Sequence, residues 1–384
     1  MLRILTAGES HGPACLAVIE GMPAGVRLGV EDINEDLERR HADFGRGGRK
    51  LIEEDKAEIL SGIRYGRTLG SPIALMVRNL DFANWGEAMS LEETKKPSPK
   101  VTTPRPGHAD LAGAIKYGQD DIRNVSERAS ARETVARVMA GAVVRQMLAE
   151  FAISIASHTV QIGKVTLDKN DYSFDEVAKV FDSDPDIRCI DSATSKKMKQ
   201  AIEAAAARKD TLGGVVEVIA TGVPVGLGSV MHHDRRLDGR IAQALMSIPS
   251  AKAVEIGNAI QGAAMFGSAF QDRISYKDGR FTRQTNNSGG IEGGMSNGEN
   301  IVCRVYHKPL STLGEPLETV DMATHKSATA TVERSDICAV PRAGVIAEAM
   351  LALVLGEAMI EKFGGDHIKE MKRNFSAYLK EKGL

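Results

Sequence analysis

Residues 130–151 read SARETVARVMAGAVVRQMLAEF, and this segment has the clearest periodicity in the chain. Its apolar residues recur at helical spacing, at Val135, Val138, Met139, Ala142, Val143 and Met147. This spacing places them on one face of a helix. The sequence therefore predicts a helix here that packs into the protein core.

The start of this helix carries a second signal. Ser130 and Glu133 form the S-x-x-E pattern of a capping box, which predicts that the helix starts at Ser130. The free amides and positive dipole end of such a start, with Arg128 and Arg132 beside them, favour an anion site. An ordinary cap with exposed arginines explains the same residues equally well.

Further elements are expected on both sides of this helix. Strands are predicted at 2–6, 15–19, 153–162, 215–223 and 301–306, and helices at 32–40, 173–181, 192–208, 236–246, 345–363 and 367–380. Residues 83–106 predict a long irregular excursion, which is uncommon unless it is functional. Residues 285–298 are glycine-rich and predict a loop lined by backbone groups. The alternation of strand and helix indicates a mixed α/β protein.

The composition is that of an ordinary globular protein and disfavours several functional classes. Hydrophobic residues make up 42% of the 384 residues and charged residues 26%, which excludes wholesale disorder. The 49 Lys and Arg nearly balance the 51 Asp and Glu, so no long-range field gathers polyanions. Aromatic residues make up only 4%, and nucleic-acid binding is therefore disfavoured. At roughly 150 residues per domain, the length predicts two or three domains, or one large sandwich or barrel.

The cysteines and the apolar stretches indicate the compartment. The four cysteines are widely separated, at Cys15, Cys189, Cys303 and Cys338. They form no CxxC pair and no Cys/His ligand spacing, so we expect no metal site and a reducing cytoplasm. The N-terminal segment lacks the apolar core of an export signal, and the most apolar stretch, 343–360, is interrupted by Glu348 and Glu357. We expect a cytoplasmic protein without a membrane span.

Residues 8–12, GESHG, match the G-x-S-x-G pattern, which in a hydrolase places a serine on a tight strand-to-helix elbow. In that fold, several strands precede the elbow and the triad follows the order Ser, acid, His. Here one short strand precedes Ser10, and no helix is indicated after it. A tight glycine turn with an exposed His11 explains the pattern better.

Arginines gather in several stiff or glycine-rich segments. Residues 39–49, RRHADFGRGGR, join Arg40, Arg46 and Arg49 to a backbone that can approach a ligand closely, and the guanidinium fork suits phosphates and carboxylates. Residues 103–110, TPRPGHAD, hold Arg105 and His108 on a proline-stiffened loop, which favours a positioned general acid. Each cluster alone is usually a solvated surface loop, but their recurrence predicts local pockets for small polyanions.

A series of motifs, taken together, resembles the chorismate synthase family and follows its order across nearly the whole chain. The motifs are GESHG at 8–12, GRGGR at 45–49, RPGHAD at 105–110, ERASARET at 127–134, MSIPSAK at 246–252, NSGGIEGG at 287–294, KPLST at 308–312 and ERSD at 333–336. The resemblance implies an α/β (α+β) fold, a large sandwich in which mainly antiparallel sheets enclose a helical layer. It also implies a single domain over 1–384, in place of the two or three suggested by length, and a homotetramer.

The resemblance implies an activity as well. Family members convert 5-enolpyruvylshikimate 3-phosphate to chorismate, the last step of the shikimate pathway, by a 1,4-anti elimination of phosphate. They are carbon-oxygen lyases acting on phosphates, and they require reduced FMN although no net redox change occurs. The expected partner is this small-molecule substrate. Whether NADPH reduces the flavin on this protein, or another source supplies reduced FMN, stays open.

The motif positions that match the family's functional residues fall into three groups. The expected catalytic residues are His11, His108 and Asp336. The expected cofactor-binding residues are Arg128, Ala129, Ser130, Pro249, Ser250, Gly293, Lys308, Pro309, Leu310, Ser311, Thr312 and Arg334. The residues expected to contact NADP or the substrate anions are Arg40, Arg46, Arg49, Ser10, Arg105 and Arg342.

Two other interpretations belong to different functional classes. A serine hydrolase would use Ser10 as its nucleophile, and it would react with a serine-directed probe. A non-catalytic binder of phosphorylated metabolites would bind the same anions without releasing phosphate.

Overall fold

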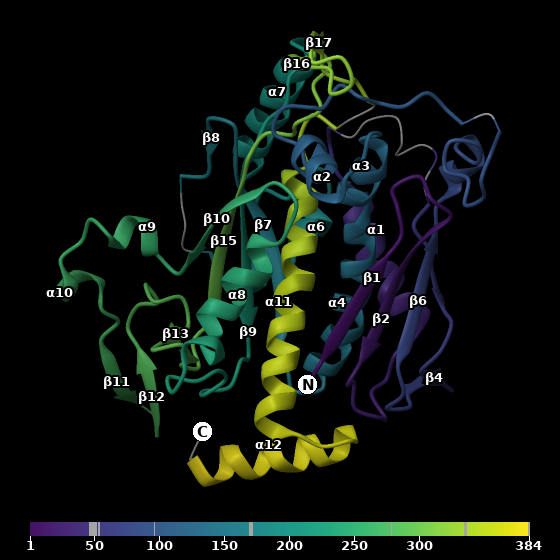
Figure 1. The fold of residues 1–384 in the computed structure, drawn as a ribbon. Coiled ribbons are helices and arrows are strands. Elements are labelled where there is room, and N and C mark those ends of the chain that lie inside the picture. The colour runs from purple at the N-terminus through teal and green to yellow at the C-terminus, as the bar shows by residue number, and fades with distance from the viewer. Residues whose placement is uncertain are drawn as a thin grey trace.

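A helical layer lies between two antiparallel sheets (Figure 1). The computed structural model describes residues 1–45, 52, 54–95, 97–168, 172–277, 279–333 and 336–382. The first sheet has the order β1 (Arg3–Ala7), β2 (Ala14–Glu20), β6 (Ile73–Arg78), β3 (Ala57–Ile59). The second has the order β10 (Ala251–Ile256), β15 (Ile301–His307), β9 (Gly214–Thr221), β7 (Ser154–Ile162), β8 (Val165–Thr166). This arrangement confirms the expected sandwich.

Two long helices form the centre of the layer. They are α4 (Thr134–Ala149), which packs on β2 and β6, and α11 (Val340–Phe363), which packs on α4, β7 and β9. The other helices are α1 (Val30–His41), α2 (Asp110–Tyr117), α3 (Arg123–Ala129), α5 (Phe174–Ala178), α6 (Val180–Ser183), α7 (Ser192–Ala207), α8 (Leu237–Met246), α9 (Ala259–Gly262), α10 (Gly267–Phe270) and α12 (Ile368–Lys382). Of these, α1 packs beside α4, and α8 packs between α11 and β10.

Short hairpins and turns complete the chain. The hairpins pair β4 (Ile63–Arg64) with β5 (Arg67–Thr68), β11 (Ile274–Lys277) with β12 (Arg280–Arg283), β13 (Ile291–Glu292) with β14 (Met295–Ser296), and β16 (Glu318–Val320) with β17 (Ser327–Thr329). Short 3₁₀ turns are η2 (Leu80–Asn84), η3 (Ala131–Glu133) and η4 (His233–Arg235). The segment 285–298 is a loop that contains one hairpin, β13–β14, whose strands have two residues each. The helix expected at 173–181 is split at Lys179 into α5 and α6.

The expected capping box at the start of the core helix is wrong. The Ser130 hydroxyl accepts a hydrogen bond from the Arg132 amide at 3.3 Å, so it caps the 3₁₀ turn η3, and α4 starts only at Thr134. The Glu133 carboxylate pairs with Arg137 at 2.8 Å, one helical turn onward. Because Glu133 pairs with Arg137, its carboxylate does not complete the capping box with Ser130.

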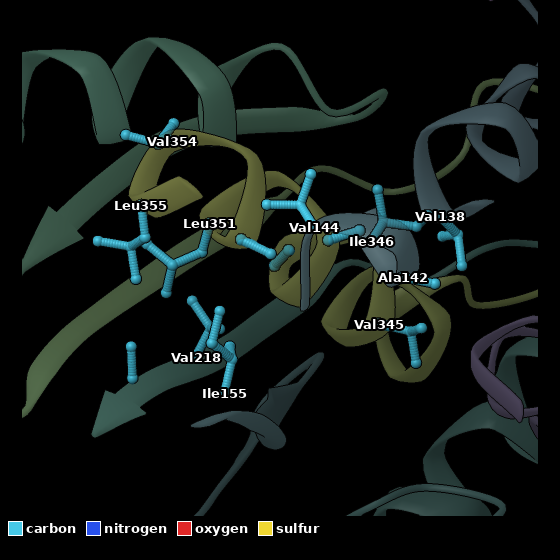
Figure 2. Close-up of a cluster of buried hydrophobic side chains, with 14 of the residues drawn as sticks. Val138, Ala142, Val144, Ile155, Val218, Val345, Ile346, Leu351, Val354 and Leu355 are labelled. Carbon is cyan, nitrogen blue, oxygen red and sulfur yellow. The ribbon is translucent and has the colours of Figure 1, made fainter. Parts of the chain in front are cut away.

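The core lies where α4 and α11 meet the second sheet. Figure 2 shows valines and other aliphatic side chains of α4 and α11 packed together above Ile155 of β7 and Val218 of β9. A Cβ placed on Gly141 would lie 2.4 Å from the Cβ of Ala349, so this glycine allows the two helices to approach closely. The six apolar residues singled out by periodicity are all buried, but α4 is buried on nearly every side, because it lies between the first sheet and α11.

Helix α11 is long and apolar enough to cross a membrane, but 83% of its most apolar window is buried inside the protein. It starts at Val340, five residues before the expected start, because Pro341 lies in its first turn, where a missing amide costs no hydrogen bond. Glu348, which interrupts its apolar sequence, is fully buried and is met by Arg39 and Arg145. These features are those of a core helix.

Candidate active site

Segments that are distant in sequence converge on one pocket. They are the β1–β2 turn, the end of α1, the loop before α2, the end of α3, the start of α4, the start of α11, and the loops joined to β10 and β15. The cavity has a volume of about 380 Å³, within the usual range for a small-molecule site. Most of the expected site residues line it: Ser10, His11, Arg40, Arg105, His108, Ala129, Ser130, Pro249, Ser250, Lys308, Leu310, Ser311, Thr312, Asp336 and Arg342.

The other expected residues lie elsewhere or outside the described residues. Arg128 does not line the pocket, because its guanidinium donates at 3.1 Å to each of the backbone oxygens of Thr6 and Gly8. Gly293, in the β13–β14 turn, and Pro309 do not line it either. Arg46, Arg49 and Arg334 are outside the described residues.

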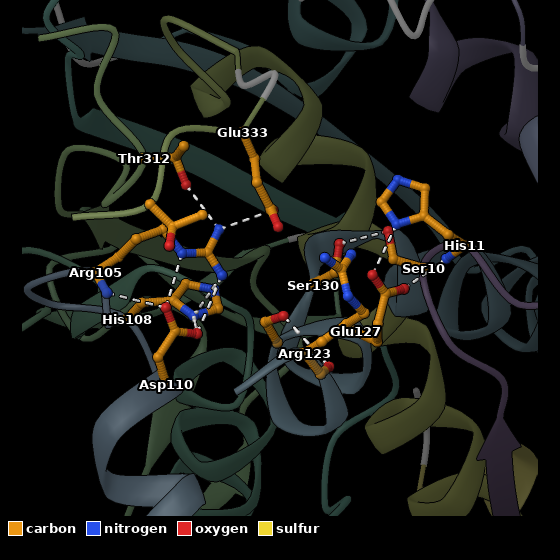
Figure 3. A network of polar contacts seen from close by, with 12 residues as sticks. Ser10, His11, Arg105, His108, Asp110, Arg123, Glu127, Ser130, Thr312 and Glu333 are labelled. Atoms are coloured by element: carbon orange, nitrogen blue, oxygen red, sulfur yellow. Dashed lines mark hydrogen bonds and ion pairs between the residues drawn. The ribbon is translucent and has the colours of Figure 1, made fainter. Parts of the chain in front are cut away.

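His11 is held by Glu127 (Figure 3) and by Trp85. Its Nδ1 lies 2.8 Å from Glu127 Oε1, and its backbone amide donates to Glu127 Oε2 at 2.7 Å. The indole of Trp85 stacks on the imidazole with ring centroids 3.9 Å apart. Next to His11, Ser130 Oγ and Ser10 Oγ are 3.1 Å apart. The expectation of a solvent-exposed His11 is therefore wrong, since its side chain is only 15% exposed.

His108 has a similar arrangement on the opposite wall. Its Nδ1 lies 2.5 Å from Asp110 Oδ1, two residues onward. Burial raises the pKa of Asp110, but the hydrogen bonds and charges of His108 and Arg105 outweigh it and hold that pKa well below its ordinary value. The carboxylate therefore stays ionised beside His108 at neutral pH.

Arg105 is the centre of a polar network on this wall (Figure 3). It donates to Asp110 at 2.8 Å through Nε, to Thr312 Oγ1 at 3.0 Å and to Glu333 at 3.1 Å. The side chain is almost fully buried, and its fork is fixed by these acceptors. The prolines of this loop predicted a side chain with a fixed position, and the contacts with Asp110, Thr312 and Glu333 hold the Arg105 side chain in place.

A buried carboxylate holds two arginines at the pocket floor. Asp55 bonds Arg132 at 2.5 Å and Arg40 at 3.2 Å, and both arginines line the pocket. Burial raises the pKa of Asp55, but the charges of Arg132 and Arg40 outweigh it and lower the pKa. Asp55 therefore fixes both guanidinium groups where they line the pocket.

Asp336 forms an ion pair with Arg342, whose Nε also lies 3.4 Å from Asp43. Burial lowers the pKa of Arg342, but the charges of Asp336 and Asp43 outweigh it and raise the pKa. Arg342 therefore stays charged in the pocket wall. The expected acid and one expected anion-binding arginine are direct neighbours.

Lys308 presents a cation in a partly buried place. Its Nζ donates to Ser311 Oγ at 2.7 Å and to the Gly107 backbone oxygen at 3.0 Å, which are both neutral acceptors. Burial, together with the charge of Lys252, lowers the pKa of Lys308. An anion bound in the pocket would stabilise the charged form of Lys308.

Behind the pocket wall, His307 supports a strained serine. Ser250 has a φ of 70°, in the left-handed region, and its Oγ lies 3.0 Å from His307 Nδ1. Burial lowers the pKa of His307 to about 4. The imidazole is therefore neutral at neutral pH.

We predict that this histidine makes the fold acid-sensitive. As pH falls below the unfolded-state value of about 6.5, the unfolded chain binds a proton that the native chain resists, so stability is lost until about pH 4. The loss is on the order of 3 kcal/mol. Urea denaturation from pH 7 to pH 4 should show a smaller loss for His307→Gln, and equal losses in both proteins would contradict the assignment.

Several site residues were not expected from sequence. Glu127, Asp110 and Glu333 lie within the quoted motifs, but nothing in their spacing shows which side chain they contact. Trp85 is the only tryptophan in the sequence, and the one sequence signal that could have pointed to it is its place in the irregular excursion 83–106. Asp55 carries no sequence signal at all, because its two arginine partners come from other segments.

Comparisons with known proteins show the family of this chain. A family model described as chorismate synthase matches residues 2–360. Chorismate synthases of Moorella thermoacetica and Solibacter usitatus are 52% and 50% identical, with alignments covering 98% and 99% of each chain respectively. A crystal structure of a chorismate synthase superposes with a TM-score of 0.80 at 41% identity, covering 99% of this chain and 98% of the other. The chain therefore belongs to the chorismate synthase family.

Proposed function

We propose that the pocket binds 5-enolpyruvylshikimate 3-phosphate and eliminates its phosphate in the 1,4-anti sense, giving chorismate. The enzyme is then a lyase that breaks a carbon-oxygen bond to phosphate. The observation that carries the proposal is that two histidine–carboxylate pairs face the same cavity as Arg40, Arg105, Arg342 and Lys308. A phosphate leaves an allylic carbon readily when fixed cations and proton donors meet its charge.

The cations match the substrate's charges. One phosphate and two carboxylates need several donors, and guanidinium forks bind both groups in a bidentate manner. Arg40 and Arg105 are each held in place by buried carboxylates, so they do not need to reorganise when an anion arrives. We assign substrate binding to them, to Arg342 and Ser10, and to Arg46 and Arg49.

The family uses a flavin, and the pocket's donor set fits one. An apolar wall of Ile248, Pro249, Leu310 and Ile346 adjoins the hydroxyls of Ser130 and Ser250 and the Lys308–Thr312 loop, which suits a flat ring carrying a phosphate. We assign FMN binding to these segments, with Ala129, and to the family positions Arg128, Gly293, Pro309 and Arg334. Reduced FMN, when bound, supplies transient electron density to the reacting substrate. NADPH is a candidate reductant.

We assign the proton work to His11, His108 and Asp336. The two histidines, each held through Nδ1, supply protons to the leaving phosphate and to the reduced flavin. Asp336 helps to draw the proton from substrate C6. Asp336 forms an ion pair with Arg342, and both side chains line the same pocket.

An anaerobic assay tests this function and its cofactor requirement. The full chain is mixed with substrate and FMN, and chorismate and phosphate are measured after reduction with NADPH or with dithionite. Phosphate release with dithionite alone would identify an external source of reduced flavin, and release with NADPH would show that the protein reduces its own. No release with pre-reduced FMN would contradict the proposed activity and favour a metabolite binder.

Ser10 is expected not to react as a nucleophile. Its hydroxyl lies 3.1 Å from Ser130 Oγ, while Nδ1 of the adjacent His11 is engaged by Glu127, which is not the arrangement of an activated serine nucleophile. Incubation with a fluorophosphonate probe should leave the protein unlabelled by mass spectrometry. Stoichiometric labelling at Ser10 would revive the hydrolase.

The proposal includes the assembly and the location. One cluster of buried hydrophobic residues includes side chains of both sheets and of α4 and α11, which supports a single unit over 1–384. We propose a cytoplasmic homotetramer, on the strength of the family.

A further inference from the structure

Glu127 is a buried carboxylate whose contacts are directed to one histidine. Its side chain is 4% exposed, and its two oxygens take the Nδ1 and the backbone amide of His11 separately. Its own backbone oxygen accepts from the Ser10 amide at 3.0 Å. The end of α3 therefore fixes both the backbone and the ring of His11.

The ring is also fixed on one face. Trp85 stacks on it at an interplanar angle of 20°, and Arg123 of α3 lies 5.3 Å from the indole centroid. Among the described residues, no hydrogen bond joins the other ring nitrogen, Nε2, to the protein. Glu127 takes Nδ1 (Figure 3) and Trp85 covers one face of the ring, which leaves Nε2 of His11 for a bound ligand.

We propose that Glu127 is the positioning residue for His11, which keeps the proton on Nδ1 and presents Nε2 to the pocket. The proposal rests on the function proposed above. In a histidine, the partner of one ring nitrogen decides the protonation of the other, so the carboxylate sets which nitrogen exchanges protons with a ligand. The carboxylate also stabilises the imidazolium, which is the form that donates a proton.

The charges around the pair agree with this role. Burial raises the pKa of Glu127, but the hydrogen bond and charge of His11 outweigh it and lower the pKa, with Arg123 adding to the effect. Across the pocket, Arg105 also interacts electrostatically with Glu127. The coupling between carboxylate and imidazole is reciprocal, so a neutral amide at position 127 should disfavour the imidazolium.

The stacked tryptophan provides a direct test. Trp85 is the only tryptophan in the chain, and a protonated imidazole quenches a stacked indole because it accepts an electron from the excited state. Fluorescence of the ligand-free full chain is titrated from pH 5 to pH 9, for wild type, Glu127→Gln and His11→Asn. We expect the fluorescence to change with pH in wild type and not in His11→Asn, and we expect the change to lie at lower pH in Glu127→Gln.

Steady-state kinetics with pre-reduced FMN complete the test. Glu127→Gln should lower kcat at least about tenfold while KM changes by less than about threefold, because the loss concerns proton transfer and not binding. Glu127→Asp keeps the charge on a shorter side chain and should recover part of kcat. Glu58→Gln is the matched control, since that carboxylate pairs with Arg78 on the surface and should behave as wild type.

The outcomes separate this inference from the proposed function. A wild-type chain without the fluorescence transition, or a Glu127→Gln chain with the wild-type midpoint or the wild-type kcat, overturns the positioning role. If Glu127→Gln does not fold by circular dichroism, the same two measurements on Glu127→Asp decide. The titration needs no substrate, so a wild-type chain that titrates as expected but forms no chorismate contradicts the proposed function alone.

Discussion

His108→Ala should lower turnover with pre-reduced FMN at least about tenfold, towards the ~10²–10⁴ contribution of a positioned acid or base. The substitution removes the imidazole that Asp110 holds at 2.5 Å against the pocket. It should not unfold the protein, because Asp110 keeps its hydrogen bonds to the Nε, the Nη2 and the backbone amide of Arg105. FMN should still bind in the presence of substrate. Stopped-flow measurement of chorismate formation checks the rate, and circular dichroism checks the fold.

The chain contains a matched control for this experiment. His232 lies 2.6 Å from Asp234, with the same two-residue spacing as His108 and Asp110, but both side chains are more than 60% exposed. His232→Ala should therefore turn over as wild type. Equal rates for wild type and His108→Ala would show that the histidine on this wall does not act in the reaction, whatever the family.

The sequence was sufficient to predict the elements whose signals are local. The helices α1, α7, α8 and α12 and the strands β1, β2, β7, β9 and β15 were expected within a few residues of their bounds, whereas the strands β3, β6, β8 and β10 were not predicted. The six apolar residues that periodicity singled out in α4 are all buried. The start of α4 was missed, since Ser130 and Glu133 have other partners, and α11 starts five residues earlier than expected, with Pro341 in its first turn.

The site was predictable in its members but not in its connections. Motif positions identified His11, His108 and Asp336, and the fold brings all three to one pocket. The carboxylates that hold them depend on tertiary contacts: Glu127 is 116 positions from His11 in sequence. Arg128 differs from these residues, since its guanidinium donates to the backbone of the first strand and its predicted ligand contact stays a prediction. A pattern of residue types does not fix where a long side chain points.

Asp336→Asn should nearly abolish chorismate formation while substrate still binds. The amide keeps the shape of the side chain and can still contact Arg342, but it cannot take up the C6 proton. We expect kcat with pre-reduced FMN to fall by about 10²–10⁴ and the substrate dissociation constant to change by less than about threefold. Rapid-quench measurement of phosphate and calorimetry of substrate binding check the two values.

The Arg342 contact creates an alternative that the same variant can separate. If Asp336 acted only by orienting Arg342, its loss would weaken substrate binding, because the guanidinium would lose its anchor and Asp43 alone would hold it. A raised substrate dissociation constant with an unchanged kcat would therefore show that Asp336 contributes to anion binding and is not the base. If instead Asp336 takes the proton, deuterium at C6 should slow Asp336→Asn more than wild type, since proton removal becomes the slowest step. An isotope effect that does not increase, together with wild-type turnover, would exclude Asp336 from the chemistry and leave Arg342 as the functional member of the pair.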